Sequence, residues 1–328
     1  MSVPSLSASR LTRRAFAAVA ALGAARIAFA AYPERPITVS LPFGAGVAIE
    51  VTIRMVCEEA GKILGQPVVV ENRSGALQRL PALAVRRATP DGYTLGVGTD
   101  SVHVAQPVID PTFTMRPNKD FEPVAALISL PLVIVSNPSV SFRDIKGLVA
   151  YAKANPGKIN FAVPTGSTAH FAALLLQEIT GTNMSIVPYK DQASSLPDLM
   201  SGRVDLTISG ATVKTSVESG KLNALAVTIA NRWSAFPAVP TLKELGYDVD
   251  VAAWFTLLAP PGTPADVVAR INSAFNQAMQ SPVVRRRLGE VNMTDLGNNM
   301  SPKQIVSMID SEVKLWTPVL QKSGVKFQ

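Results

Sequence analysis

Four short segments of small residues are the parts of this 328-residue sequence best suited to binding chemistry. They are residues 42–48 (PFGAGVA), 72–75 (NRSG), 98–103 (GTDSVH) and 164–170 (PTGSTAH). Each follows an apolar run and precedes a helical pattern, so its backbone N–H groups lie at the positive end of a helix dipole. Such a place can bind a carboxylate or phosphate without a lysine. Singly, each is more often a tight turn with a helix cap, but four at equivalent positions favour a ligand cleft.

Local signatures of enzymes are missing from the sequence. It contains no G-x-S-x-G, H-E-x-x-H or G-x-x-x-x-G-K-[ST] motif, and the G-A-G of residues 44–46 lacks the third glycine of a dinucleotide site because Ile49 stands there. The single Cys57 and the two histidines, His103 and His170, exclude a disulfide framework and a Cys/His zinc module. We therefore expect no catalytic residue, no metal and no cofactor, with Cys57 as a small core residue.

The net charge of +7 is concentrated at the N-terminus. Arg10, Arg13, Arg14 and Arg26 lie within thirty residues that carry no acid, and without these four of the 31 basic residues, 27 remain against 24 acidic ones. This balance is typical of an ordinary surface rather than of a phosphate-binding stripe, so we expect no nucleic-acid partner.

Residues 1–30 have the pattern of a signal peptide. Basic residues precede an apolar run at 15–25, and Ala28-Phe29-Ala30 fits the small-x-small rule for cleavage. The adjacent Arg13 and Arg14 resemble a twin-arginine export signal, with a general secretory signal as the alternative. No later segment is typical of a membrane span. We expect a soluble periplasmic protein that begins near Ala31.

Short β-branched runs alternate with helical stretches in two successive units, which is typical of α/β lobes with mainly parallel sheets covered on both faces. We expect lobe 1 to comprise residues 31–131 and 257–328, and lobe 2 residues 132–256. Extended crossings near 130–136 and 252–258 would form a two-stranded hinge, and two facing sheets then make a cleft that can close. The expected strands are 37–41, 67–70, 93–97, 131–136, 159–163, 186–189, 204–209, 222–228 and 254–259.

Helix signals accompany these strands. Helical periodicity covers 49–64 and 144–154, and Thr263 and Ser301 each precede a proline, as N-cap residues do. Gln304, three residues after Ser301, completes a capping box. The following apolar residues fall on one face and predict a buried stripe, made of Ile305, Ile309, Val313, Trp316 and Leu320.

A series of motifs across the chain resembles the substrate-binding proteins of tripartite tricarboxylate transporters, the Bug or TctC-like family. The motifs are YPxRPI at 32–37, PFxAG at 42–46, GQPVVVENR at 65–73, PDGYTL at 90–95, KDFxPV at 119–124, ANPGK at 154–158, GSTxH at 166–170, VPYK at 187–190, GKLxALAVT at 220–228, VPT at 239–241, WF at 254–255 and APxGTP at 259–264. Together they span nearly all of the chain after the signal peptide.

The resemblance implies a type II periplasmic binding fold whose two lobes close on a small carboxylate. It implies that main-chain amides of the first two loops hold that group, and that the second lobe and a surrounding wall complete the pocket. The residues of the first two loops are Phe43, Gly44, Ala45, Gly46, Val47, Ala48, Asn72 and Gly75. The second lobe would supply Gly166, Ser167, Thr168 and His170, with Tyr189 and Lys190 as further candidates, and the wall would comprise Thr99, Ser101, His103 and Trp254.

Three residues depart from the family pattern: Arg79 in a loop usually built of glycines, Glu50 early in the first helix, and Asp191 after Tyr-Lys. We expect Arg79 to face the cleft and pair with a distal anionic group of the ligand. The alternatives are a solvated arginine at a helix start or a partner of Glu50. For His103 and His170 the alternative to ligand contact is capping or packing between the lobes.

The sequence thus predicts a monomeric solute-binding receptor, not an enzyme, that captures a small carboxylate and delivers it to membrane transporter subunits. Two alternatives stay open: a ligand-sensing module for a signalling partner, and an α/β enzyme on the same two-lobe architecture. Turnover of the bound ligand would distinguish the enzyme from the receptor.

Overall fold

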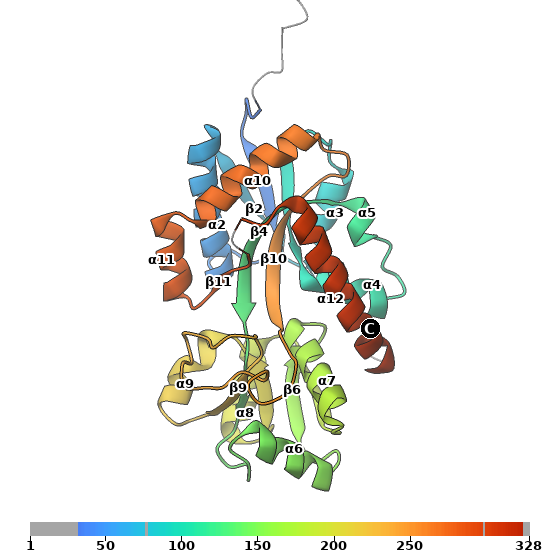
Figure 1. The fold of residues 1–328 in the computed structure, drawn as a ribbon, viewed down its shortest axis with the longest axis vertical. Helices are drawn as coiled ribbons and strands as arrows, with labels where there is room; N and C mark the ends of the chain where they lie inside the picture. The colour runs from blue at the N-terminus through green and yellow to red at the C-terminus, as the bar shows by residue number, and fades with distance from the viewer. Residues whose placement is uncertain (1–31, 76–77, 298, 324–328) are drawn as a thin grey trace, which may run out of the picture.

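The computed structural model describes residues 32–75, 78–297 and 299–323. It has two lobes stacked along the long axis of the molecule (Figure 1). The predicted signal peptide lies outside the described residues. Among the described helices, none combines the length and apolar character needed to cross a bilayer.

Lobe 1 is built on a six-stranded sheet in the order β11-β4-β10-β3-β1-β2. β1 runs parallel to β2 and β3, whereas β10 is antiparallel to β3 and β4, and β11 is antiparallel to β4. The sheet is therefore mixed rather than mainly parallel. Its strands are β1 (Ile37–Leu41), β2 (Val68–Asn72), β3 (Thr94–Thr99), β4 (Glu122–Pro131), β10 (Ala252–Ala259) and β11 (Thr294–Asp295).

The helices of lobe 1 bury apolar faces against this sheet. In α2, for example, Ile53, Val56, Cys57 and Ala60 recur at helical spacing and are fully buried, which places Cys57 in the core as predicted. α2 ends at Leu64 and is followed by the C-cap residue Gly65, whose φ of 78° suits a residue without a side chain. The helices are α2 (Ala48–Leu64), α3 (Arg79–Arg87), the π-helical turn η2 (Ser101–Ala105), α4 (Gln106–Ile109), α5 (Pro117–Asp120), α10 (Ala265–Met279) and α11 (Pro282–Glu290).

Lobe 2 has a five-stranded sheet in the order β7-β6-β8-β5-β9. β6 runs parallel to β7 and β8, and β5 is antiparallel to β8 and β9, so this sheet is also mixed. Its strands are β5 (Val133–Ser136), β6 (Asn160–Pro164), β7 (Ser185–Tyr189), β8 (Leu206–Ser209) and β9 (Asn223–Val227). Its helices are α6 (Ile145–Ala154), α7 (Thr168–Thr180), α8 (Gln192–Ser201), η3 (Ala211–Val213) and α9 (Lys214–Glu218).

Two extended segments join the lobes, in the region where a two-stranded hinge was predicted. β4 passes through Leu132 directly into β5, and the chain returns into β10. Buried Thr228 ties the two crossings together: its N–H donates to Leu132 O at 3.0 Å, and its carbonyl accepts from Val251 N at 2.8 Å. The predicted lobe boundary at 256/257 falls inside β10, whose pairing with β4 begins at Ala252.

The last helix, α12 (Pro302–Ser323), contacts both lobes: η2, α4 and β4 in lobe 1, and α7 in lobe 2 (Figure 1). The capping box of Ser301 and Gln304 is confirmed, with reciprocal bonds of 2.9 and 3.4 Å. The predicted stripe is buried except for Val313, which is half-buried. Thr263, by contrast, does not cap α10. Its hydroxyl donates to Pro260 O, and the helix begins one residue later than predicted.

Candidate functional site

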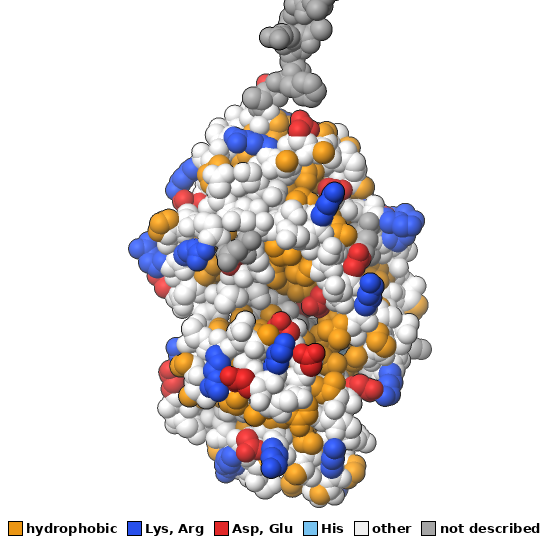
Figure 2. Space-filling view, viewed as in Figure 1, with side chains coloured by type: hydrophobic (Ala, Val, Ile, Leu, Met, Phe, Trp, Pro, Cys, Tyr) orange, Lys and Arg blue, Asp and Glu red, His pale blue; other side chains and the backbone are white. Residues whose placement is uncertain are grey.

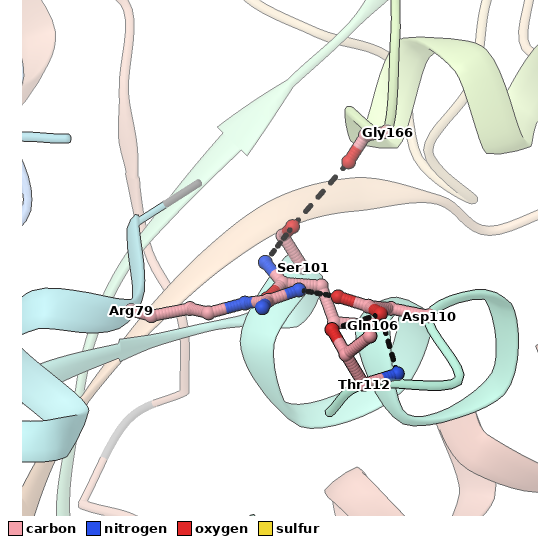
Figure 3. Close-up of polar contacts among 6 residues, drawn as sticks. All are labelled: Arg79, Ser101, Gln106, Asp110, Thr112 and Gly166. Carbon is pink, nitrogen blue, oxygen red and sulfur yellow. Dashed lines mark hydrogen bonds and ion pairs between the residues drawn. The ribbon is translucent and has the colours of Figure 1, made fainter. Parts of the chain in front are cut away.

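The carboxyl ends of the parallel strands in the two lobes face each other across the junction. The loop after β3 contacts the loop after β6: the Ser101 hydroxyl donates to Gly166 O at 3.3 Å (Figure 3), and the Thr168 hydroxyl donates to the Asp100 carboxylate. Ligands of open α/β sheets bind beyond such strand ends. The structure therefore brings together the third and fourth of the predicted segments.

The first segment, residues 42–48, is held in place by side chains that bond to its backbone. Asn72 Nδ2 donates to Phe43 O at 3.0 Å, and Gly46 N donates to Glu50 at 2.9 Å. Arg54 binds both Glu50 and the Asn72 side-chain oxygen. Burial opposes the ionisation of Glu50, but the bonds from Gly46 and Arg54 together lower its pKa. Glu50 thus positions the loop, and its partner is Arg54 rather than Arg79.

The N-terminus of α2 is open. Its N-cap residue, Val47, offers no side-chain hydrogen bond and is 47% exposed. Residues 44–48 are all exposed. The first amides of a helix have no partner inside the helix, and here no side chain caps them. Anion binding by the amides of residues 44–48 stays a prediction, and the N–H of Gly46 within this segment is already bonded to Glu50.

Arg79 belongs to a chain of polar contacts that reaches lobe 2 (Figure 3). Its guanidinium donates to the side-chain oxygen of Gln106 and to the carboxylate of Asp110, and it lies 5.0 Å from the Phe113 ring centroid. Gln106 Nε2 donates to Ser101 Oγ at 3.1 Å, and Ser101 in turn donates to the carbonyl of Gly166. The alternative prediction that Arg79 pairs with Glu50 is wrong, because Arg79 pairs with Asp110. Contact of Arg79 with a ligand stays a prediction.

Asp110 is the anchor of this chain. The hydroxyl of Thr112 and then the guanidinium of Arg79 lower the pKa of Asp110 to about 2. Both side chains of the ion pair are largely buried, at 19% exposure for Arg79 and 8% for Asp110. The pair therefore fixes the start of α3 against the turn that follows α4.

Both histidines are buried and hold backbone groups. His103 Nδ1 donates to Thr99 O at 3.0 Å, and its ring lies 5.8 Å from the rings of Phe121 and Trp254. His170 Nδ1 accepts from Gly166 N at 3.2 Å. Burial lowers the pKa of each to about 4, so both are neutral near pH 7. His103 and His170 therefore make packing and capping contacts, which the sequence analysis gave as the alternative to ligand contact. Ligand contact by either histidine stays a prediction.

The remaining predicted residues differ in where their side chains lie. Ser167 caps α7 by accepting from His170 N. The Tyr189 hydroxyl donates to the carboxylate of Asp198 on α8 at 2.7 Å. Lys190 is exposed. Asp191 caps α8 in a capping box with Ser194. Trp254 is 2% exposed and packs in the core beneath the loops.

Asp100 was not among the predicted site residues. It is 9% exposed, and burial raises its pKa to about 6 although its bond from Thr168 opposes the shift. The sequence signal that could have identified Asp100 is the presence of an acidic residue between Thr99 and Ser101, in a loop of small residues. Among residues 32–75, 78–297 and 299–323, no three His, Cys, Asp or Glu side chains are grouped to hold a metal ion.

Two α/β lobes on a two-stranded hinge, with strand-end loops in contact across the junction, define a two-lobed binding protein. Residues 52–325 match the tripartite tricarboxylate transporter family receptor, and the chain belongs to this family. Protein BugT of Bordetella pertussis is 34% identical over 93% of this chain and 94% of its own length. The family resemblance seen in the sequence is confirmed.

Two solved structures have the same fold. MatC from Rhodopseudomonas palustris, with bound malate, is 31% identical, with a TM-score of 0.73 over 88% of this chain and 100% of that one. Rpa4515 from R. palustris, with adipate, is 31% identical, with a TM-score of 0.76 over 90% of this chain and 99% of that one.

Proposed function

We propose that this receptor captures a small dicarboxylate between its lobes in the periplasm and delivers it to the membrane subunits of a transporter. The observation that carries the proposal is the uncapped N-terminus of α2, which lies at the same end of its sheet as the loop that contacts lobe 2. The relatives that hold malate and adipate support the ligand class.

One carboxylate of the ligand would bind the first amides of α2. These groups need no reorganisation when an anion arrives, because the helix already fixes them and Glu50 and Asn72 already hold the preceding loop. Lobe 2 would supply the loop at 165–167, of which Thr165 is exposed, and rotation about the crossings at Leu132 and Val251 would open and close the pocket.

Export and partners follow from the same proposal. The predicted signal peptide at 1–30 would direct the chain across the membrane, and the receptor would then act as a monomer without catalysis. On the face shown in Figure 2, positive and negative side chains are interspersed over both lobes, which supports a small-molecule ligand over a nucleic acid.

A thermal-shift series tests the ligand class. A ligand that binds only the folded state stabilises it by ~2.7 kcal/mol at a hundredfold excess over Kd. We expect malate or adipate to raise Tm by several degrees, and adipamide, which matches adipate without its charges, to leave Tm unchanged. Stabilisation by adipamide or by neutral sugars alone would overturn the carboxylate assignment. NMR of recovered ligand, showing it unaltered, separates a receptor from an enzyme.

A further inference from the structure

Asp100 is a buried carboxyl group at the contact between the two lobes. It belongs to the loop after β3 in lobe 1, and it accepts a hydrogen bond from the hydroxyl of Thr168, the first residue of α7 in lobe 2. Only 9% of Asp100 is exposed. Separation of the lobes withdraws α7 from this carboxyl group, so the group meets water when the molecule opens.

No basic side chain compensates Asp100 in the part of the chain that the structure describes. The ion pairs among residues 32–75, 78–297 and 299–323 do not include it. Arg79, which reaches the neighbouring loop through Gln106, is already paired with Asp110. Because burying a carboxylate without a cation is unfavourable, contact between the lobes favours the neutral acid.

The other titratable groups at the junction add negative charge or none. Glu312 of α12 is half-buried, and its pKa is raised by its own burial and then by the nearby Asp100 and the exposed Asp250. His103 on η2 and His170 on α7 are neutral above pH 5, because burial lowers the pKa of each to about 4. A proton is therefore the available means of neutralising Asp100.

The pKa of Asp100 gives the direction of the effect. Burial raises it to about 6 from the ordinary value of 3.8, although the bonds from Thr168 and from the backbone of residues 100 and 101 oppose the shift. With the lobes apart, the carboxyl group is in water and the ordinary value applies. Protonation thus stabilises the closed arrangement; this contribution is complete below about pH 4 and is lost as pH rises through 6.

We propose that the two lobes close on their ligand together with one proton, which Asp100 takes up at the lobe junction. The inference rests on the proposed capture of a dicarboxylate between the lobes. On closure the proton passes from solvent to the carboxylate, cancels its charge and leaves an oxygen that still accepts from Thr168. Opening returns the proton to solvent. The receptor therefore loads more readily as the surrounding medium becomes more acidic.

Calorimetric titration with malate, repeated in buffers of different ionisation enthalpy, counts the protons taken up. At pH 6 we expect about half a proton more per ligand for the wild type than for Asp100→Asn, which keeps an acceptor for Thr168. The difference between the two proteins removes the ligand's own titration. Between pH 8 and pH 5, the ratio of the wild-type Kd to the Asp100→Asn Kd should fall about tenfold. Asp248→Asn, at a side chain that is 93% exposed, is the matched control and should behave as the wild type.

Small-angle X-ray scattering of the unliganded protein tests the same group without a ligand. We expect the radius of gyration of the wild type to be smaller at pH 5 than at pH 8, because protonation favours closure. Asp100→Asn should be equally compact at both pH values.

Equal proton uptake by the wild type and Asp100→Asn would overturn the proposal, as would a wild-type radius of gyration that does not change with pH. Loss of the uptake in Glu312→Gln, with Asp100→Asn unaffected, would assign the proton to Glu312 and reject Asp100. If neither malate nor adipate binds, the proposed ligand class fails, and the scattering comparison still decides whether Asp100 links protonation to closure.

Discussion

The hydroxyl of Ser101 in lobe 1 donates to the carbonyl oxygen of Gly166 in lobe 2 at 3.3 Å, and the same hydroxyl oxygen accepts from Gln106 Nε2 at 3.1 Å. The contact joins the loop after β3 to the loop that begins α7. It places a direct bond between the lobes beside the junction at which the ligand is proposed to bind, so the protein itself stabilises this arrangement of the two lobes.

Removal of that hydroxyl should weaken ligand capture. Ser101→Ala deletes one neutral hydrogen bond, worth about 0.5–1.5 kcal/mol, so we expect the dicarboxylate Kd to rise about two- to tenfold. Ser141→Ala, an exposed serine of lobe 2, is the control. Calorimetry of both variants checks the expectation, and equal Kd values in the two would show that the bond does not contribute.

Replacement of Arg79 should lower the stability of the folded protein. Arg79→Ala leaves the buried Asp110 without its cation, and loss of one partner of a buried pair costs about 3 kcal/mol. Arg79→Lys keeps the charge but cannot reach Gln106 and Asp110 together, so we expect an intermediate loss. Denaturant melts at pH 7 measure both.

The pH dependence of this loss follows from Asp110. Its folded pKa, about 2, lies below the unfolded value, so its stabilisation is present above about pH 4 and is lost as pH falls through 2. The gap between wild type and Arg79→Ala should therefore narrow at low pH. A large rise in ligand Kd without a loss of stability would instead return Arg79 to the role of a ligand contact.

The first amide of α2 can be deleted with little effect on the helix. Ala48 is the first helical residue, and Val47 before it has φ −73° and ψ 149°, a conformation that tolerates a following proline. Ala48→Pro removes one N–H, and Ala48→Gly keeps it. Because a hydrogen bond to a charged group is worth about 1.5–3 kcal/mol, we expect Ala48→Pro to raise the dicarboxylate Kd more than tenfold. Unchanged affinity in the proline variant would place the carboxylate elsewhere.

Glu312 on α12 should make stability fall as pH rises. Burial raises its pKa to about 7; the bond from Trp316 opposes the shift, and the nearby Asp100 and Asp250 add to it. A raised folded pKa means that the contribution is complete below the unfolded value, near 4.5, and is lost as pH rises through 7.

Glu312→Gln removes this dependence and retains an acceptor for Trp316 Nε1, which donates to Glu312 at 2.5 Å. We expect the variant and wild type to melt together near pH 4 and the variant to melt several degrees higher at pH 8. Parallel curves of Tm against pH would contradict the assignment.

Local patterns were enough to predict most of the fold. β-branched runs, the box of Ser301 and Gln304 and the apolar stripe after it depend on neighbours in sequence, and they predicted strands, a helix start and its buried face. The sheets are mixed because the crossing strands enter them antiparallel, which periodicity cannot show. Thr263 fails as a cap because its hydroxyl instead bonds to Pro260.

The site was harder to predict because its contacts are long-range. Asp110 lies 31 residues from Arg79, and Gly166 lies 65 residues from Ser101. Sequence could indicate that small-residue loops gather at strand ends, since this follows from the topology. It could not show that Gln106 and Asp110 would occupy the guanidinium of Arg79, because that depends on how α3 packs beside the turn after α4.

The placement of β10 between β4 and β3 dictates an order of events during synthesis. The five strands of lobe 2 lie within residues 133–227, so that sheet can assemble as soon as those residues are made. The sheet of lobe 1 must wait for residues 252–259, because its central position is empty until they arrive. The N-terminal half of lobe 1 is thus made first and finished last, because one edge of β3 and both edges of β4 stay unpaired until β10 and β11 are made.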